Sequence, residues 1–338
     1  MSVRQRQEVE ALLRLGARLG GRLSDVFPAH TDHEPPGPRG CGASLKGQLD
    51  LFAHSRTVIL LNDLSDSLLE HNTARVRERL QLLRAEAPGH PALDALGTLC
   101  GALEQWPAAT TGAGDTAKVV EWLDSEVAQA AASALGTSAP PFMRSLWRAL
   151  AVSVASQPYD PAHPQSHCAH CHLRAGDAPA ALTAVATIHG RDLDPFVLQW
   201  VTLARHRTSG WHASRAPLFT LALTAPQHLP AVLTALADPS LHGAWERFWL
   251  DCAWLDPLDT TAGAWFPAWY LIEHPALRFD EPVAAADPDA SPARAFQATR
   301  LLLALEPSGY GAALISARAE LRRIDARLFE HYMSRRES

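Results

Sequence analysis

The sequence predicts an all-α protein in which helical hairpins either stack as an α-solenoid-like repeat or form an irregular multi-helix array. Apolar residues recur at helical spacing along most of the 338 residues. Proline and glycine interrupt this spacing at intervals typical of helical hairpins. No segment alternates apolar and polar residues between hairpin signals such as Asn-Gly or Asp-Gly. We therefore expect helices throughout and no sheet.

The N-terminal third is expected to hold one helix, a long loop and a helical region, over residues 1–26, 27–47 and 48–111. The loop is predicted from its many prolines and glycines. Within the helical region, Asn72 or Thr73 is expected to cap a helix that ends at the Pro-Gly pair after residue 87. The apolar stripe of that helix consists of Val76, Leu80 and Leu83.

Residues 112–338 are expected to form a helical-repeat-like region. This region and the part before residue 112 form either one continuous domain or two domains packed together. A helix is expected to begin near Asp115 or Thr116. Further segments with helical spacing include "PPFMRSLWRALAVSVAS", "DPFVLQWVTLARHR", "APLFTLALTA" and "SPARAFQATRLLLALE".

One stretch of about residues 162–195, containing "CHLRAGDAPAALTAVATIHGRDLDP", has the small residues of a helix-turn-helix unit. Gly176 lies at the predicted turn, and Ala169 and Ala181 are the small residues expected where the two helices touch. With Pro195 ending the unit, this stretch resembles the second half of a tetratricopeptide repeat. The resemblance implies a helical-repeat architecture.

The charge balance argues against two classes of partner. With 30 Lys and Arg against 36 Asp and Glu, the net charge is −6, so no overall field attracts a nucleic-acid backbone or an anionic membrane. The N-terminal residues lack the uninterrupted apolar core of a secretory signal, and no stretch approaches the roughly 18 apolar residues of a membrane span. We expect a cytoplasmic protein with neither nucleic acid nor membrane as its partner.

The segment "HPQSHCAHCHLRAG" concentrates potential metal ligands. Its C-x-x-C-H string matches the haem-attachment signature of c-type cytochromes, but that attachment normally takes place outside the cytoplasm. Zinc or iron without haem is the other cofactor that these side chains could bind. If one helix ran from Pro164 to Gly176, its ligands would face too many directions for one ion, and one or two ligands from elsewhere would be needed. The alternative is a polar helix face with buried thiols. The candidate ligands are His163, His167, Cys168, His170, Cys171 and His172.

A second unusual stretch runs from residue 245 to 274 and is rich in tryptophan. Pairs of tryptophans at i, i+4 spacing indicate either core packing or a concave aromatic surface for a peptide or flat ligand. In the second case the polar rim would consist of Arg247, Asp251, Asp256, Asp259, Glu273 and His274. Asp256 and Asp259 could also serve in general acid/base work, but turn formation or helix capping explains both more simply.

The sequence contains no G-x-S-x-G, H-E-x-x-H or phosphate-loop string and no convincing catalytic set, so it favours a binding protein over an enzyme but leaves both open. We expect a helical scaffold or accessory protein that binds a protein or peptide partner through a groove. The competing interpretation is a metal- or haem-dependent protein that uses the histidines and cysteines of 163–172. The predicted partner-binding residues are Trp200, Arg205, Trp211, Arg215, Trp245, Arg247, Trp249, Trp265 and Trp269.

Overall fold

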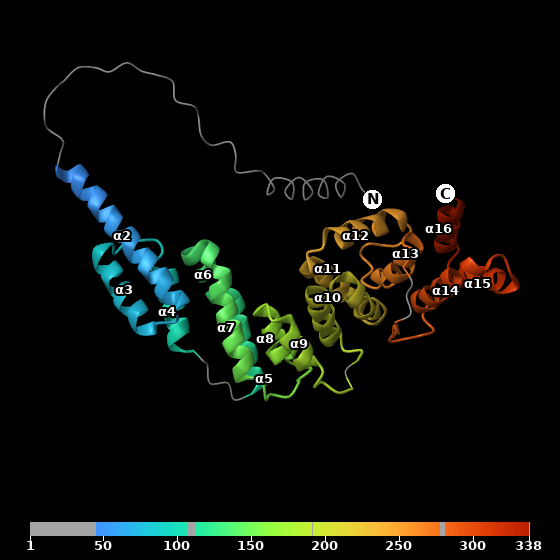
Figure 1. The fold of residues 1–338 in the computed structure, drawn as a ribbon, viewed down its shortest axis with the longest axis horizontal. Helices are drawn as coiled ribbons and strands as arrows, with labels where there is room; N and C mark the ends of the chain where they lie inside the picture. The colour runs from blue at the N-terminus through green and yellow to red at the C-terminus, as the bar shows by residue number, and fades with distance from the viewer. Residues whose placement is uncertain (1–44, 107–111, 191, 278–280, 338) are drawn as a thin grey trace, which may run out of the picture. The chain divides into compact units, whose positions relative to one another are not determined.

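The computed structural model describes residues 45–106, 112–190, 192–277 and 281–337, and the chain divides into two units, 1–52 and 53–338. The predicted helix of 1–26 and most of the predicted loop of 27–47 lie outside the described residues. Within the described residues every regular element is helical, which confirms the all-α prediction. Helices that follow one another in the chain lie against each other (Figure 1). None of the described helices is long and apolar enough to cross a membrane.

The first described helices follow the predicted pattern. Helix α2 covers Leu45–Leu69, α3 covers Thr73–Glu86 and α4 covers Leu93–Glu104. Asn72 is the N-cap of α3, because its Oδ1 accepts the amide hydrogen of Arg75 at 3.1 Å. The predicted stripe of α3 is buried in full.

The next helices share a core with the first ones. Helix α5 (Ala113–Trp122) continues through a π turn (Leu123–Val127) into α6 (Ala128–Leu135), and α7 covers Ala139–Ser153. Buried side chains of α2 to α4 and of α5 to α8 form one hydrophobic cluster. Residues on both sides of position 112 therefore contribute to a single core.

A tight helical hairpin follows. Helices α8 (Cys168–Arg174) and α9 (Ala178–Val185) are joined at Gly176, whose φ of 80° favours glycine. Ala169 and Ala181 are fully buried, as the sequence predicted. Two expectations for this segment are wrong. The single helix from Pro164 is instead a 3-10 turn (Pro164–Ser166), an extended His167 and then α8, and Pro195 starts the next helix rather than ending a unit.

Helix α10 (Pro195–Thr224) consists of two halves that meet at Gly210. Gly210 has φ 74° and ψ −167°, a backbone conformation that only glycine adopts readily. Residues from both halves line the same cavity, so the chain folds back at this glycine. Asp194 caps the first half by accepting the amide hydrogens of Phe196 and Val197 at 3.0 and 3.3 Å.

The C-terminal helices build a second large core together with the second half of α10. They are α11 (Leu229–Leu236), α12 (Pro239–Asp251), α13 (Phe266–Glu273), α14 (Ser291–Leu305), α15 (Ala312–Ile324) and α16 (Ala326–Glu337). The largest fully buried side chains of this core are aromatic, namely Phe219, Phe248, Phe266, Trp269, Phe296 and Tyr332.

Candidate functional site

Two of the four histidines of the 163–172 segment, His163 and His167, have hydrogen-bonding partners, whereas His170 Nε2 and His172 Nδ1 are buried without one among the residues that the structure describes. His163 Nδ1 lies 3.1 Å from Asp160 Oδ2, outside the helix. His167 is buried and acts as the N-cap of α8, because its Nδ1 accepts the amide hydrogen of Ala169 at 3.2 Å. Its ring stacks on Trp200 with the centroids 5.7 Å apart. His167 thus starts a helix and packs against an aromatic ring.

The buried groups of this segment favour their neutral forms. Burial, followed by the nearby charge of Arg174, lowers the pKa of His170 to about 4. Burial, followed by the neighbouring Cys168, raises the pKa of Cys171 to about 12. Burial also raises the pKa of Cys168, so both thiols favour the protonated form in these surroundings.

The six candidate ligands of 163–172 do not bring three ligand atoms within 4.8 Å of one another. Among the residues that the structure describes, the histidines, cysteines and acids that do so are Asp251, Glu273 and His331. The C-x-x-C-H string forms most of α8, and its residues pack mainly against α7 and the first half of α10.

The residues predicted to bind a partner are divided between interior and surface. Trp200, Arg215 and Trp269 are at most 4% exposed, so they belong to the interior and not to the predicted surface. The tryptophans that are partly buried and pack against the C-terminal core are Trp211, Trp245, Trp249, Trp254 and Trp265. The side chains that remain exposed are Arg205 and Arg247. The tryptophan spacing therefore reflects core packing.

A cavity of about 970 Å³ lies between the end of α9, both halves of α10 and the segment 281–284. Arg205 is the predicted partner-binding residue that lines it. Most of the lining is apolar and includes Val185, Ile188, Val197, Leu198, Val201 and Pro217. The polar lining residues are His189, Asp192, Arg205, Thr220 and Glu281. Sequence reasoning missed this cavity because ordinary apolar residues carry no local signal of a groove.

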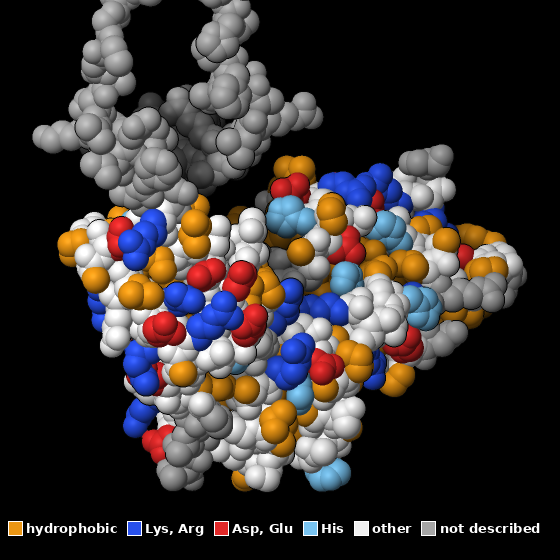
Figure 2. Space-filling model, turned by 60° about the vertical axis from the view of Figure 1, so that its left-hand side comes forward, with side chains coloured by type: hydrophobic (Ala, Val, Ile, Leu, Met, Phe, Trp, Pro, Cys, Tyr) orange, Lys and Arg blue, Asp and Glu red, His pale blue; other side chains and the backbone are white. Residues whose placement is uncertain are grey.

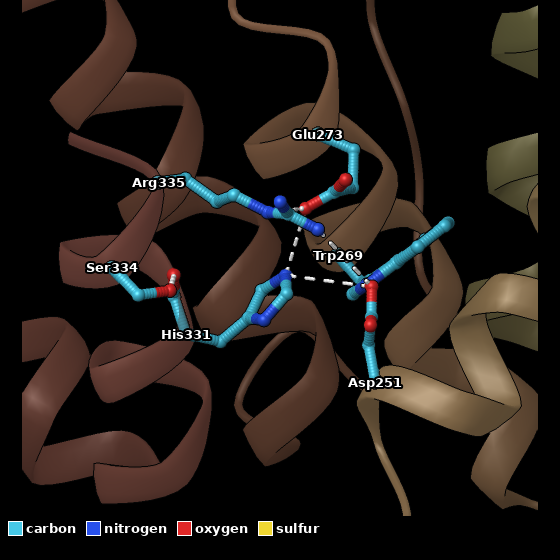
Figure 3. A network of polar contacts seen from close by, with 6 residues as sticks. All are labelled: Asp251, Trp269, Glu273, His331, Ser334 and Arg335. Carbon is cyan, nitrogen blue, oxygen red and sulfur yellow. Dashed lines mark hydrogen bonds and ion pairs between the residues drawn. The ribbon is translucent and has the colours of Figure 1, made fainter. Parts of the chain in front are cut away.

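A polar network joins the ends of α12 and α13 to α16 (Figure 3). Asp251 and Glu273 are the last residues of their helices, whereas His331 and Arg335 lie one turn apart on α16. His331 Nε2 is 2.9 Å from Glu273 Oε1 and 4.0 Å from Asp251 Oδ2. Trp269 Nε1 donates a hydrogen bond to Asp251 Oδ2 at 3.1 Å.

Arg335 contacts both carboxylates of this network. Its Nε donates to Glu273 Oε1 at 2.6 Å, and its Nη2 lies 3.6 Å from Asp251 Oδ2. The side chains of Glu273 and His331 are 8% and 11% exposed, whereas that of Arg335 is 44% exposed. Glu273 and His331 are therefore almost completely shielded from solvent, whereas Arg335 is partly exposed.

The sequence analysis included Asp251 and Glu273 in a polar rim but missed their partners. The predicted rim contained Glu273 and its neighbour His274, whereas the structure places Glu273 against His331, 58 residues later in the chain. No local pattern joins residues so far apart. Asp256 and Asp259 accept backbone hydrogen bonds from residues two positions later, as expected for turn formation.

On the face drawn in Figure 2, acidic and basic side chains are interspersed and are not gathered by sign. Comparison with known proteins found no match for this chain among family models, curated proteins or solved structures. Its function is therefore argued from its own residues.

Proposed function

We propose that this protein is a helical scaffold or accessory protein that binds an apolar segment of a partner protein in the cavity between the two halves of α10. The observation that carries the proposal is the cavity itself, with a volume of about 970 Å³ and a mostly apolar lining. Three separate parts of the chain supply that lining, and it opens to solvent. Apolar concave surfaces with polar edges are typical of binding sites.

The composition of the cavity favours a peptide segment as its occupant. The lining offers apolar contacts from several positions along two helical halves, which suits consecutive side chains of a peptide. Each Val- or Leu-sized side chain that leaves water there contributes about 1.5–3 kcal/mol before the costs of association.

The charged lining residues indicate which charges should flank the apolar centre of the bound segment. Asp192 and Glu281 bring two carboxylates, whereas Arg205 brings one positive charge. The whole chain also has a net charge of −6. We therefore expect a segment with apolar residues at its centre and Lys or Arg beside them.

Peptide display on the purified chain tests the proposal. Peptides selected by the wild-type protein should lose at least tenfold in affinity for Val201→Glu, which places a charge in the lining. The matched control is Val152→Glu, because Val152 is 70% exposed on α7 and does not line the cavity. If no peptide is enriched, or if both variants bind the selected peptides equally, the proposal is wrong.

A further inference from the structure

We propose that Asp251, Glu273 and His331 form a binding site for a divalent transition-metal ion of the zinc class. The site is separate from the cavity of α10 and does not depend on the function proposed for it. Two carboxylate oxygens and one imidazole nitrogen are ligand types that zinc uses in proteins. They come from three different helices, so an ion bound there would join α12, α13 and α16.

The spacing of the ligand atoms fits such an ion. With metal-ligand distances of about 2.1 Å, tetrahedral coordination places neighbouring ligand atoms about 3.4 Å apart. The distances from His331 Nε2 to Glu273 Oε1 and to Asp251 Oδ2 are 2.9 and 4.0 Å, which lie on either side of that value. All three ligand atoms lie within 4.8 Å of one another. Small side-chain rotations are enough to bring them around one ion.

Two neighbouring carboxylates, one of them nearly buried, need a positive charge beside them. Glu273 is 8% exposed, and a charge with so little solvent must be paired. In the structure Arg335 supplies that charge through its contacts with both carboxylates. Its side chain is 44% exposed, so it can turn into solvent when a metal ion takes over the charge of the carboxylates. Arg335 and the ion are therefore competitors for the same two acids.

Two surrounding residues complete the geometry. Trp269 is fully buried and fixes Asp251 through the hydrogen bond from Nε1 to Oδ2, as residues around metal ligands commonly do. Cys252, adjacent to Asp251, is also fully buried. Three protein ligands leave room for water or another molecule in the fourth position.

Isothermal titration of the full chain with ZnSO4, after removal of metals with a chelator, tests the site. Wild type should bind one zinc ion that His331→Gln and Glu273→Gln each weaken at least tenfold, whereas MgCl2 should not bind there. Arg335→Gln should bind zinc at least as tightly as wild type, because it removes the competing charge. Circular dichroism and urea unfolding of each variant identify any that fail to fold.

Cys171→Ser is the matched control, since it alters the other group of potential ligands in the chain, and it should bind zinc as wild type does. A thermal unfolding scan adds a second readout, in which zinc should raise the melting temperature of wild type and Arg335→Gln but not of His331→Gln. The proposal is overturned if no zinc binds, if folded His331→Gln and Glu273→Gln bind it as wild type does, or if Cys171→Ser abolishes binding. Weaker binding by folded Arg335→Gln would contradict the competition between the arginine and the ion.

Discussion

Replacing Gly210 with alanine tests whether the reversal within α10 depends on glycine. At φ 74° and ψ −167°, a residue with a Cβ atom is strained, at a cost of about 1–3 kcal/mol. A Cβ atom added at Gly210 meets no other atom within 4 Å, so this cost comes from the backbone and not from a clash. We therefore expect Gly210→Ala to lower the free energy of unfolding by about that amount.

Urea unfolding, followed by circular dichroism, measures the effect against Gly243→Ala. Gly243 lies inside α12 with ordinary helical geometry, and a Cβ atom added there also meets nothing within 4 Å. Alanine is the better helix former, so Gly243→Ala should raise the free energy of unfolding by about 0.5–1 kcal/mol. The two variants should thus change stability in opposite directions. If Gly210→Ala is as stable as wild type, the account of the reversal is refuted.

Three further predictions concern the cap of α10, the buried histidine and the thiols. Asp194→Ala removes the N-cap of α10 and should cost about 1 kcal/mol in urea unfolding, and an unchanged midpoint would contradict the capping role. Burial and the charge of Arg174 lower the pKa of His170 from 6.5 to about 4. As the pH falls, His170 is therefore protonated in the unfolded chain before it is protonated in the folded chain. His170 should therefore not affect the free energy of unfolding above pH 6.5, and should lower it by at most about 3 kcal/mol between pH 6.5 and 4. The His170→Gln variant should lack this part of the decline. The same pH slope in both proteins would show that the folded state accepts the proton. In a Cys41→Ser chain, the thiols should react with DTNB at pH 8 only after urea is added, and rapid reaction of the folded chain would contradict their burial. The thiols concerned are Cys100, Cys168, Cys171 and Cys252.

Features that depend on neighbouring residues were predicted well from the sequence. The cap at Asn72 and the buried stripe of α3 follow from residues within a few turns of one another. The turn at Gly176 and the buried Ala169 and Ala181 follow in the same way. Helical periodicity and turn chemistry are local properties, so one sequence is enough to read them.

The candidate sites depend on distant residues and were not predicted. The approach of His331 to Glu273 and Asp251 results from how α16 packs, and no spacing in the sequence encodes it. His167 was expected as a candidate metal ligand on a helix starting at Pro164, but the 3-10 turn at Pro164 leaves it extended as the cap of α8. Trp200 was expected on a surface, but it is buried against His167. This burial depends on the packing of α10 against α8, which no local pattern predicts.

The packing of consecutive helices has a consequence for the order of folding. Most helix contacts join neighbours in the chain, so they close short loops and can form early at little entropic cost. The contacts from Glu273 to His331 and Arg335 instead close loops of 58 and 62 residues. During synthesis on the ribosome, Glu273 emerges long before its partners His331 and Arg335 of α16. The docking of the last helix is thus the step at which the C-terminal core is completed.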